Sequence, residues 1–215
     1  MVTRINVGCG RTPVSGWLNL DNSPSVRWAE WRRVFALLSW LGVVGEEQRL
    51  MAEAAVAHGI RWADGVRGLP LADHSVAVVY ASHMFHHLHP SEARRFLVEA
   101  LRVLIPGGVL RLVVPDLRRL AERYVADGDA ETFLRTLDLS PRVPRAFRGR
   151  LRLLILGHRY RRWMYDAASL AALLRSVGFA EPREFPPGET QIADPGALNL
   201  REREGESIYI EARAA

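Results

Sequence analysis

Residues 3–21, which read TRINVGCGRTPVSGWLNLD, decide the fold. A short β-rich run, Thr3–Val7, ends in the glycine turn Gly8-Cys9-Gly10, and a second β-rich run ends at Asp21. Glycine after a strand lets the backbone approach a ligand closely, and a carboxylate on the next strand can accept both hydroxyls of a ribose. The third glycine of the dinucleotide fingerprint is missing, and only 13 residues separate Gly8 from Asp21, against roughly 20 in that fingerprint. The segment therefore favours a nucleoside ligand without a diphosphate over NAD, and a plain tight turn is the alternative.

The rest of the chain alternates between predicted strands and helices. This alternation predicts βαβ units and a mainly parallel sheet with helices on both faces. The expected strands are residues 3–7, 17–20, 60–63, 75–81, 109–114, 180–185 and 207–213, with a turn at 106–108. The expected helices are 90–104, 116–126 and a helix capped by Asp166 that runs to 177, together with a helical insert at about 26–58 and a helical, basic cover at about 129–165. A single domain over residues 1–215 is expected.

The net charge of +5 comes from 29 basic residues, all of them Arg, and 24 acidic residues. Residues 142–162 contain eight Arg and no acidic residue, so the positive charge belongs to one segment. This local excess argues against a nucleic-acid-binding surface spread over the whole protein. One Cys excludes an intramolecular disulfide framework, and the absence of both a long apolar stretch and a signal-peptide pattern predicts a cytoplasmic protein.

Six motifs in order identify a family resemblance over about residues 3–125. They are 6–10 (NVGCG), 16–21 (GWLNLD), 63–65 (ADG), 69–76 (LPLADHSV), 80–88 (YASHMFHHL) and 101–108 (LRVLIPGG). In this order and spacing the chain resembles the class I S-adenosylmethionine-dependent methyltransferases, especially the compact bacterial type 11 group. The resemblance implies a Rossmann-like sheet of seven strands whose last strand is antiparallel, with S-adenosylmethionine as cofactor and S-adenosylhomocysteine as product.

The resemblance also implies roles for individual residues. The backbone of Gly8, Cys9 and Gly10 would line the amino-acid end of the cofactor, and Asp21 would hold the ribose hydroxyls. Asp64 and Gly65 would face the adenine, and Ser82 and His83 would border the methyl-transfer site. The short segment after the glycines and the long gap between Asp21 and Asp64 depart from the family pattern.

Four histidines follow the fourth predicted strand: His83, His86, His87 and His89. One of them, with His83, His86 and His87 as the candidates, could act as a general base toward an attacking hydroxyl or amine. His83 and His87 are four residues apart, which is a metal-ligand spacing on a helix. The segment straddles a strand end and a turn, and no Cys or carboxylate is close in sequence, so no metal is expected. A structural role for the His pair is the alternative.

Other candidates lie later in the chain. Asp116 follows a strand and is a candidate substrate contact or an N-cap, while His158 and Tyr165 are candidate substrate contacts. The basic segment 142–162 predicts an amphipathic helix with its arginines in solvent, a capture site for an acidic substrate, or peripheral contact with a membrane.

These features predict methyl transfer to oxygen or nitrogen of a small molecule, with a sugar or natural product as the expected acceptor class. The oligomeric state is left open. Two alternatives remain at this point, a non-catalytic nucleoside-binding or membrane-surface adaptor and an RNA methyltransferase. A third, a metal-dependent hydrolase built on the histidines, would require a bound zinc.

Overall fold

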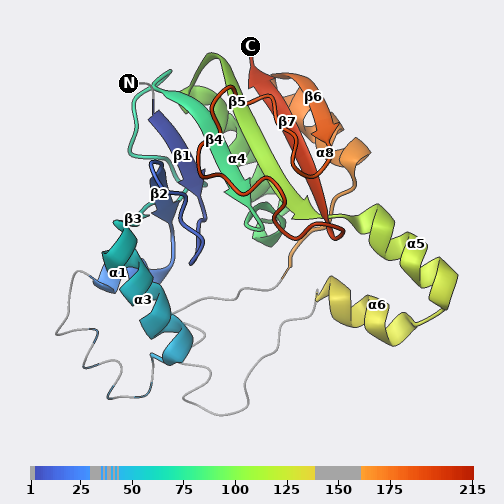
Figure 1. The fold of residues 1–215 in the computed structure, drawn as a ribbon, viewed down its shortest axis with the longest axis horizontal. Coiled ribbons are helices and arrows are strands. Elements are labelled where there is room, and N and C mark those ends of the chain that lie inside the picture. Colours follow the sequence, from blue (N-terminus) through green and yellow to red (C-terminus); the bar gives the residue numbers. More distant parts are fainter. Residues whose placement is uncertain are drawn as a thin grey trace.

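The computed structural model describes residues 3–29, 35, 37, 40, 42, 44–138 and 161–215. Its centre is a seven-stranded sheet in the order β3-β2-β1-β4-β5-β7-β6 (Figure 1). The strands are β1 (Thr3–Val7), β2 (Leu18–Asp21), β3 (Arg61–Trp62), β4 (Val76–Ser82), β5 (Leu104–Pro115), β6 (Phe179–Phe185) and β7 (Ser207–Ala214). The five neighbouring strands β3, β2, β1, β4 and β5 pair in parallel. β7 is antiparallel to both of its neighbours, β5 and β6. The predicted mainly parallel sheet with an antiparallel last strand is confirmed.

β5 is longer than the sequence predicts. Residues 106–108 were expected to form a turn, but the strand runs through them from Leu104. The register of β5 against β4 shifts in this region, because Val76 pairs with Leu104 whereas Val78 pairs with Val109. The Pro-Gly-Gly residues are therefore the extra residues of an irregularity in the ladder, with Gly107 at a φ of 74°.

The helices are α1 (Pro24–Ala29), α3 (Glu46–His58), η1 (Phe85–His87), α4 (Pro90–Val103), α5 (Leu117–Asp127), α6 (Ala130–Leu137) and α8 (Ala167–Val177). The predicted caps of α8 are confirmed. The Asp166 carboxylate accepts a hydrogen bond from the Ser169 amide at 2.7 Å, and Gly178 ends the helix in the left-handed region. Within the described residues, no helix is both long enough and apolar enough to cross a bilayer.

The two faces of the sheet are covered differently (Figure 1). α4 and α8 pack on one face and bury the main apolar core. The sequence predicts helices on the opposite face as well, but among the described residues a loop, 186–206, covers its centre. Ile192 and Leu198 of this loop bury against Val113 and Tyr209. The connection from β1 to β2, residues 8–17, contains no helix. α1 and α3 pack together with Cys9 and Ile60 in a small separate core.

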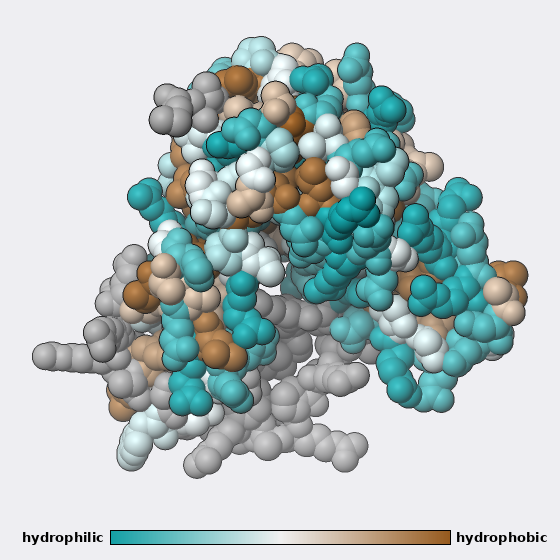
Figure 2. Space-filling model, viewed as in Figure 1, coloured by the Kyte–Doolittle hydropathy of each residue, from teal (hydrophilic) through white to brown (hydrophobic). Residues whose placement is uncertain are grey.

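The helical cover predicted at 129–165 is only partly observed. α6 lies within it, and α5 and α6 project from the sheet, with hydrophilic residues over most of their surface (Figure 1 and Figure 2). Residues 161–165 are not helical, so the prediction is wrong there. The amides of Arg162 and Trp163 donate to the carbonyl of His86 at 2.9 and 3.2 Å, and Tyr165 forms a bridge with Asp116. These tertiary bonds take the place of helical ones. Residues 139–160, and most of the predicted helix between α1 and α3, lie outside the described residues.

Candidate active site

The candidate cofactor residues meet at the carboxyl ends of the parallel strands. The strand order reverses between β1 and β4, because the chain leaves β1 for β2 on one side and β4 for β5 on the other. Ligands of open α/β sheets bind outside the carboxyl ends of the strands at such a point. Gly8 follows β1, Asp21 ends β2 and Ser82 ends β4, so the structure brings these three predicted residues to one edge.

The glycine turn needs glycine for two separate reasons. Gly8 and Gly10 have φ values of 70° and 52°, in the left-handed region that side chains disfavour. A Cβ on Gly8 would also lie 2.3 Å from Cγ of Met84, whereas a Cβ on Gly10 would have no atom within 4 Å. The amides of Gly8 and Cys9 both donate to the carbonyl of Leu20, at 2.8 and 3.1 Å. The two hydrogen bonds hold the turn against β2, Gly8 lies close against Met84, and the space beside Gly10 is open.

Asp21 is bound to the glycine turn. Its carboxylate, on a residue only 5% exposed, accepts a hydrogen bond from the amide of Gly10 at 2.9 Å and one from Ser23 at 2.7 Å. A carboxylate only accepts hydrogen bonds, and these two amides fix its orientation next to Gly10. This fixed acceptor beside an open glycine fits the ribose end of S-adenosylmethionine.

Asp64 and Gly65 lie one strand further out, just after β3. Asp64 shapes its own turn, because its carboxylate accepts from the amide of Val66 at 3.0 Å and lies 3.4 Å from Nε of Arg67. Gly65 is packed so closely that a Cβ would lie 2.9 Å from the ring of Phe96. Both residues therefore have structural roles at this edge, in addition to the adenine contact that the resemblance implies.

The three candidate histidines, His83, His86 and His87, cluster after β4. The rings of His83 and His86 meet edge to face with centroids 5.8 Å apart, and those of His86 and His87 lie 4.2 Å apart. His83 has a φ of 48°, and its amide donates to the carbonyl of Val113 on β5. The exposed His89 lies outside the cluster, at the start of α4.

Burial keeps two of these imidazoles neutral. It lowers the pKa of His83 to about 3 and that of His86, which is only 3% exposed, to about 2, and nearby positive charges add to the effect. Both rings are therefore uncharged at neutral pH and can accept a proton only weakly unless their surroundings change. Among the described residues, no three side chains of His, Cys, Asp or Glu come together as a metal site would require.

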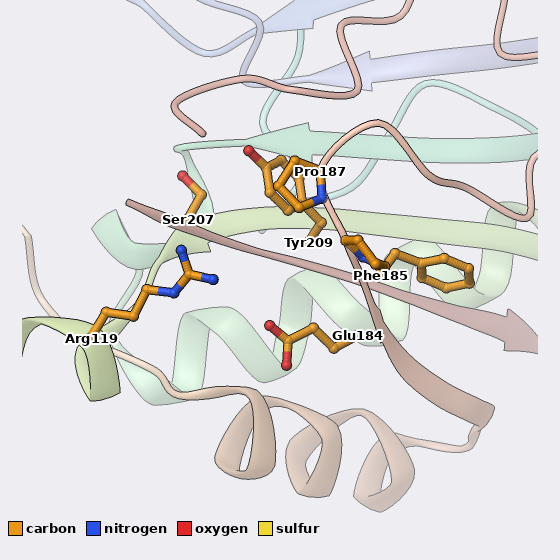
Figure 3. Close-up of a pocket in the computed structure, with 7 residues that line it drawn as sticks. Arg119, Glu184, Phe185, Pro187, Ser207 and Tyr209 are labelled. Atoms are coloured by element: carbon orange, nitrogen blue, oxygen red, sulfur yellow. The ribbon is translucent and has the colours of Figure 1, made fainter. Parts of the chain in front are cut away.

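A pocket of about 370 Å³ lies between α5, β6 and β7 (Figure 3). The guanidinium of Arg119 and the carboxylate of Glu184 point into it from α5 and β6, and Ser207 and Tyr209 of β7 line the opposite side. The hydroxyl of Ser207 is 3.1 Å from Nε2 of His83. Ser207 therefore joins this pocket to the histidine cluster. The volume of the pocket falls in the range of small-molecule sites.

The other candidate substrate residues are less accessible. Asp116 acts as the N-cap of α5, because its carboxylate accepts from the amides of Arg118 and Arg119 at 2.9 and 3.4 Å. Tyr165 is 4% exposed and packs on Phe85. Burial raises the pKa of its hydroxyl to about 12. His158 lies outside the described residues.

Sequence reasoning missed the polar network that supports the site. Asn6 on β1 donates to the side-chain oxygen of Asn19 on β2 at 3.2 Å. That oxygen also accepts from the amide of Val14 at 2.8 Å, and the Asn19 amide group donates to Val14 and Trp17. The available signal was an asparagine at the buried end of each strand, Asn6 between Ile5 and Val7 and Asn19 between Leu18 and Leu20. Ser207 gave none, because only the fold places it beside His83.

The comparisons with known proteins agree with this geometry. A family model described as a methyltransferase domain matches residues 5–112, which is half of the chain. The chain belongs to the class I S-adenosylmethionine-dependent methyltransferases. This match begins within β1, ends within β5 and includes every candidate cofactor residue. The fit of Asp21 and the glycine turn to a nucleoside agrees with S-adenosylmethionine as the cofactor. A search of the curated proteins found no match.

Solved structures of methyltransferases share the fold. A SAM-dependent methyltransferase from Thermotoga maritima, described as a possible histamine N-methyltransferase, is 17% identical with a TM-score of 0.55, over 99% of this chain and 82% of that one. One from Methanosarcina mazei is 17% identical with a TM-score of 0.52, over 98% and 91% of the two chains. PigF, solved with S-adenosylhomocysteine, is 13% identical with a TM-score of 0.51, over 99% and 56%. At these low identities, the structural similarity supports the fold of this methyltransferase and says nothing about its acceptor.

Proposed function

We propose that this methyltransferase methylates an oxygen or nitrogen atom of a small-molecule acceptor that binds between the histidine cluster and the pocket beside Ser207. The observation that carries the proposal is the position of His83. It follows β4 directly, at the same edge as the glycine turn and Asp21, and Ser207 connects it to a pocket of small-molecule size. The acceptor would therefore lie next to the cofactor's methyl end.

The division of labour among the residues follows from their positions. Gly8, Cys9, Gly10 and Asp21 hold the cofactor, with Asp64, Gly65 and Ser82 at its borders. When bound, S-adenosylmethionine supplies a methyl group on a positively charged sulfur. The chain's main contribution is then to orient the acceptor in line with that group. His83, which is within hydrogen-bonding distance of Ser207, receives the acceptor's proton when one has to be removed, and this step requires that the bound acceptor raise the low pKa of the ring.

Calorimetry with S-adenosylmethionine and S-adenosylhomocysteine tests the cofactor half of the proposal. Wild type is expected to bind both. Asp21→Asn removes the charge from hydrogen bonds to the ribose, which is worth about 1.5–3 kcal/mol, and should weaken binding about 10- to 100-fold. Asp127→Asn, at the exposed end of α5, is the matched control and should bind as wild type does. Wild type that binds neither ligand would overturn the proposal, as would equal binding by Asp21→Asn.

Transfer of a labelled methyl group tests the acceptor half. The protein is incubated with labelled S-adenosylmethionine and with separated small-molecule, RNA and protein fractions of a bacterial extract. Label is expected in the small-molecule fraction. Label in RNA alone would replace the proposal by an RNA methyltransferase, and cofactor binding without transfer to any fraction would favour a non-catalytic adaptor.

A further inference from the structure

Two arginines from distant parts of the chain act electrostatically on His83 and His86. The amides of Arg162 and Trp163 are bonded to the carbonyl of His86, so Arg161 enters directly beside η1. Its guanidinium is half-buried and donates to the carbonyl of Thr136, in the last turn of α6, at 2.6 Å. Arg203 lies four residues before Ser207, in the turn that leads into β7, and is exposed.

The electrostatic surroundings of the two rings are positive. After burial, Arg203 and Arg161 are the main charges that lower the pKa of His83, and both also lower the pKa of His86. Burial and the charge of Arg203 lower the pKa of Arg161, whereas the carboxylates of Asp138 and Glu206 raise it. In the part of the chain that the structure describes, no carboxylate is among the charges acting on His83. The site therefore presents two positive charges to any ligand that reaches the rings.

The rings also present hydrogen-bonding atoms. The Nδ1 atoms of His83 and His86 are buried and have no hydrogen-bond partner within the described residues. Leaving such an atom unpaired costs about 1–3 kcal/mol. When Nε2 of His83 accepts from the hydroxyl of Ser207, its Nδ1 carries the hydrogen and becomes a donor. Two guanidiniums and an imidazole N–H form a donor set that suits an anionic oxygen group.

We propose that Arg161 and Arg203 bind a carboxylate or phosphate group of the acceptor beside His83, so that this methyltransferase acts on an acidic small molecule. This inference rests on the proposed function, because it places the acceptor at the histidine cluster. It adds the chemical class of the acceptor and two residues that select it. The bound anion would also offset the positive charges at His83, which makes the ring a stronger proton acceptor when the correct acceptor is present.

The experiment uses the full chain saturated with S-adenosylhomocysteine, and inorganic phosphate and acetate as separate probes. The imidazole resonances of His83 and His86 are followed by NMR during each titration. We expect at least one probe to shift the resonances of both rings in a saturable way. The probe that does so shows whether the site prefers a phosphate or a carboxylate group. Arg161→Gln and Arg203→Gln should each raise the dissociation constant about tenfold or more, since a lost charged hydrogen bond is worth about 1.5–3 kcal/mol. Arg123→Gln, on the exposed side of α5, is the matched control and should not change it.

The outcomes separate this inference from the proposed function. If S-adenosylhomocysteine does not bind, the proposed function fails. If it binds and neither probe shifts the two rings, only the anion site is overturned. Equal weakening by Arg123→Gln would also overturn it, because the effect would then come from net charge. Arg203 is exposed, so Arg203→Gln keeps the test valid even if Arg161→Gln does not fold.

Discussion

Arg111 on β5 and Glu211 on β7 form an ion pair in which neither side chain has any exposure to solvent. The two residues are directly opposite in the antiparallel register. Glu211 also accepts hydrogen bonds from the hydroxyl of Thr190 at 2.5 Å and the amide of Gln191 at 2.8 Å, and Arg111 donates to the carbonyl of Glu189 at 3.0 Å. The pair therefore fixes the loop 186–206 to the second face of the sheet, where helices are absent among the described residues.

Removing one partner of this pair should be costly. Arg111→Met leaves the Glu211 carboxylate buried without its counter-charge, and breaking such a pair costs about 3–5 kcal/mol. Urea unfolding monitored by circular dichroism measures the loss. The double variant Arg111→Met/Glu211→Leu should lose less, because no charge is then left buried. Arg123→Met serves as the surface control. A single variant as stable as wild type would show that the pair does not hold the loop.

The glycine turn offers a matched comparison between two glycines. Gly10→Ala places an alanine in the left-handed conformation, which should lower the free energy of unfolding by roughly 1–2 kcal/mol. Gly8→Ala meets the same backbone and also places its Cβ 2.3 Å from Cγ of Met84, so it should be clearly less stable. Thermal unfolding compares the two, and adding Met84→Ala to Gly8→Ala should recover the difference. Equal melting temperatures for the two single variants would contradict the packing seen at Gly8.

Stability should fall when the pH is lowered through the range in which free histidine titrates. His86 has a pKa of about 2 in the folded chain and about 6.5 when unfolded. Between these values the unfolded chain binds the extra proton, so the folded state loses stability as the pH falls below about 6.5. From pH 7 to pH 5 the loss attributable to His86 is about 2 kcal/mol. His83, with a folded pKa of about 3, adds in the same direction.

Urea unfolding at pH 7 and pH 5 measures this effect. His86→Gln should show a smaller loss over this range than wild type. His89→Gln, on the exposed residue at the start of α4, should lose as much stability as wild type. The prediction fails if His86→Gln and wild type lose stability in parallel.

Asn19 should matter for the loop that follows the glycine turn. Its amide makes three hydrogen bonds to Val14 and Trp17, and the residue is 6% exposed. Asn19→Ala leaves those backbone groups without partners, at about 1–3 kcal/mol for each group left buried and unpaired. Hydrogen exchange at the amide of Val14 should become faster, while Asn22→Ala, on an exposed residue, should change neither stability nor exchange. Unchanged exchange at Val14 would mean that water or other groups replace Asn19.

The local elements were the part that sequence reasoning predicted well. Strand β1 matches its predicted bounds, Asp166 caps the start of α8 and Gly178 ends it, as expected. Helix caps and left-handed glycines depend on residues close together in the sequence, so local reasoning can find them. Asp21 was proposed because it ends the second predicted strand after the glycine turn, and the structure places it at the end of β2. Residues 106–108 were misjudged, because a Pro-Gly-Gly segment suits both a turn and a strand irregularity, and only pairing with β4 selects between them.

The sequence by itself determined the family, the strand–helix order and the cofactor edge, since these depend on motifs and short-range patterns. Tertiary structure alone decided which residues join across long separations. It brought Ser207 to His83, Arg161 to η1, and Glu211 to Arg111. The physical reason is that burial and charge depend on neighbours far away in the chain. The same imidazole is a surface group at His89 and a neutral, buried one at His86, although only two residues lie between them.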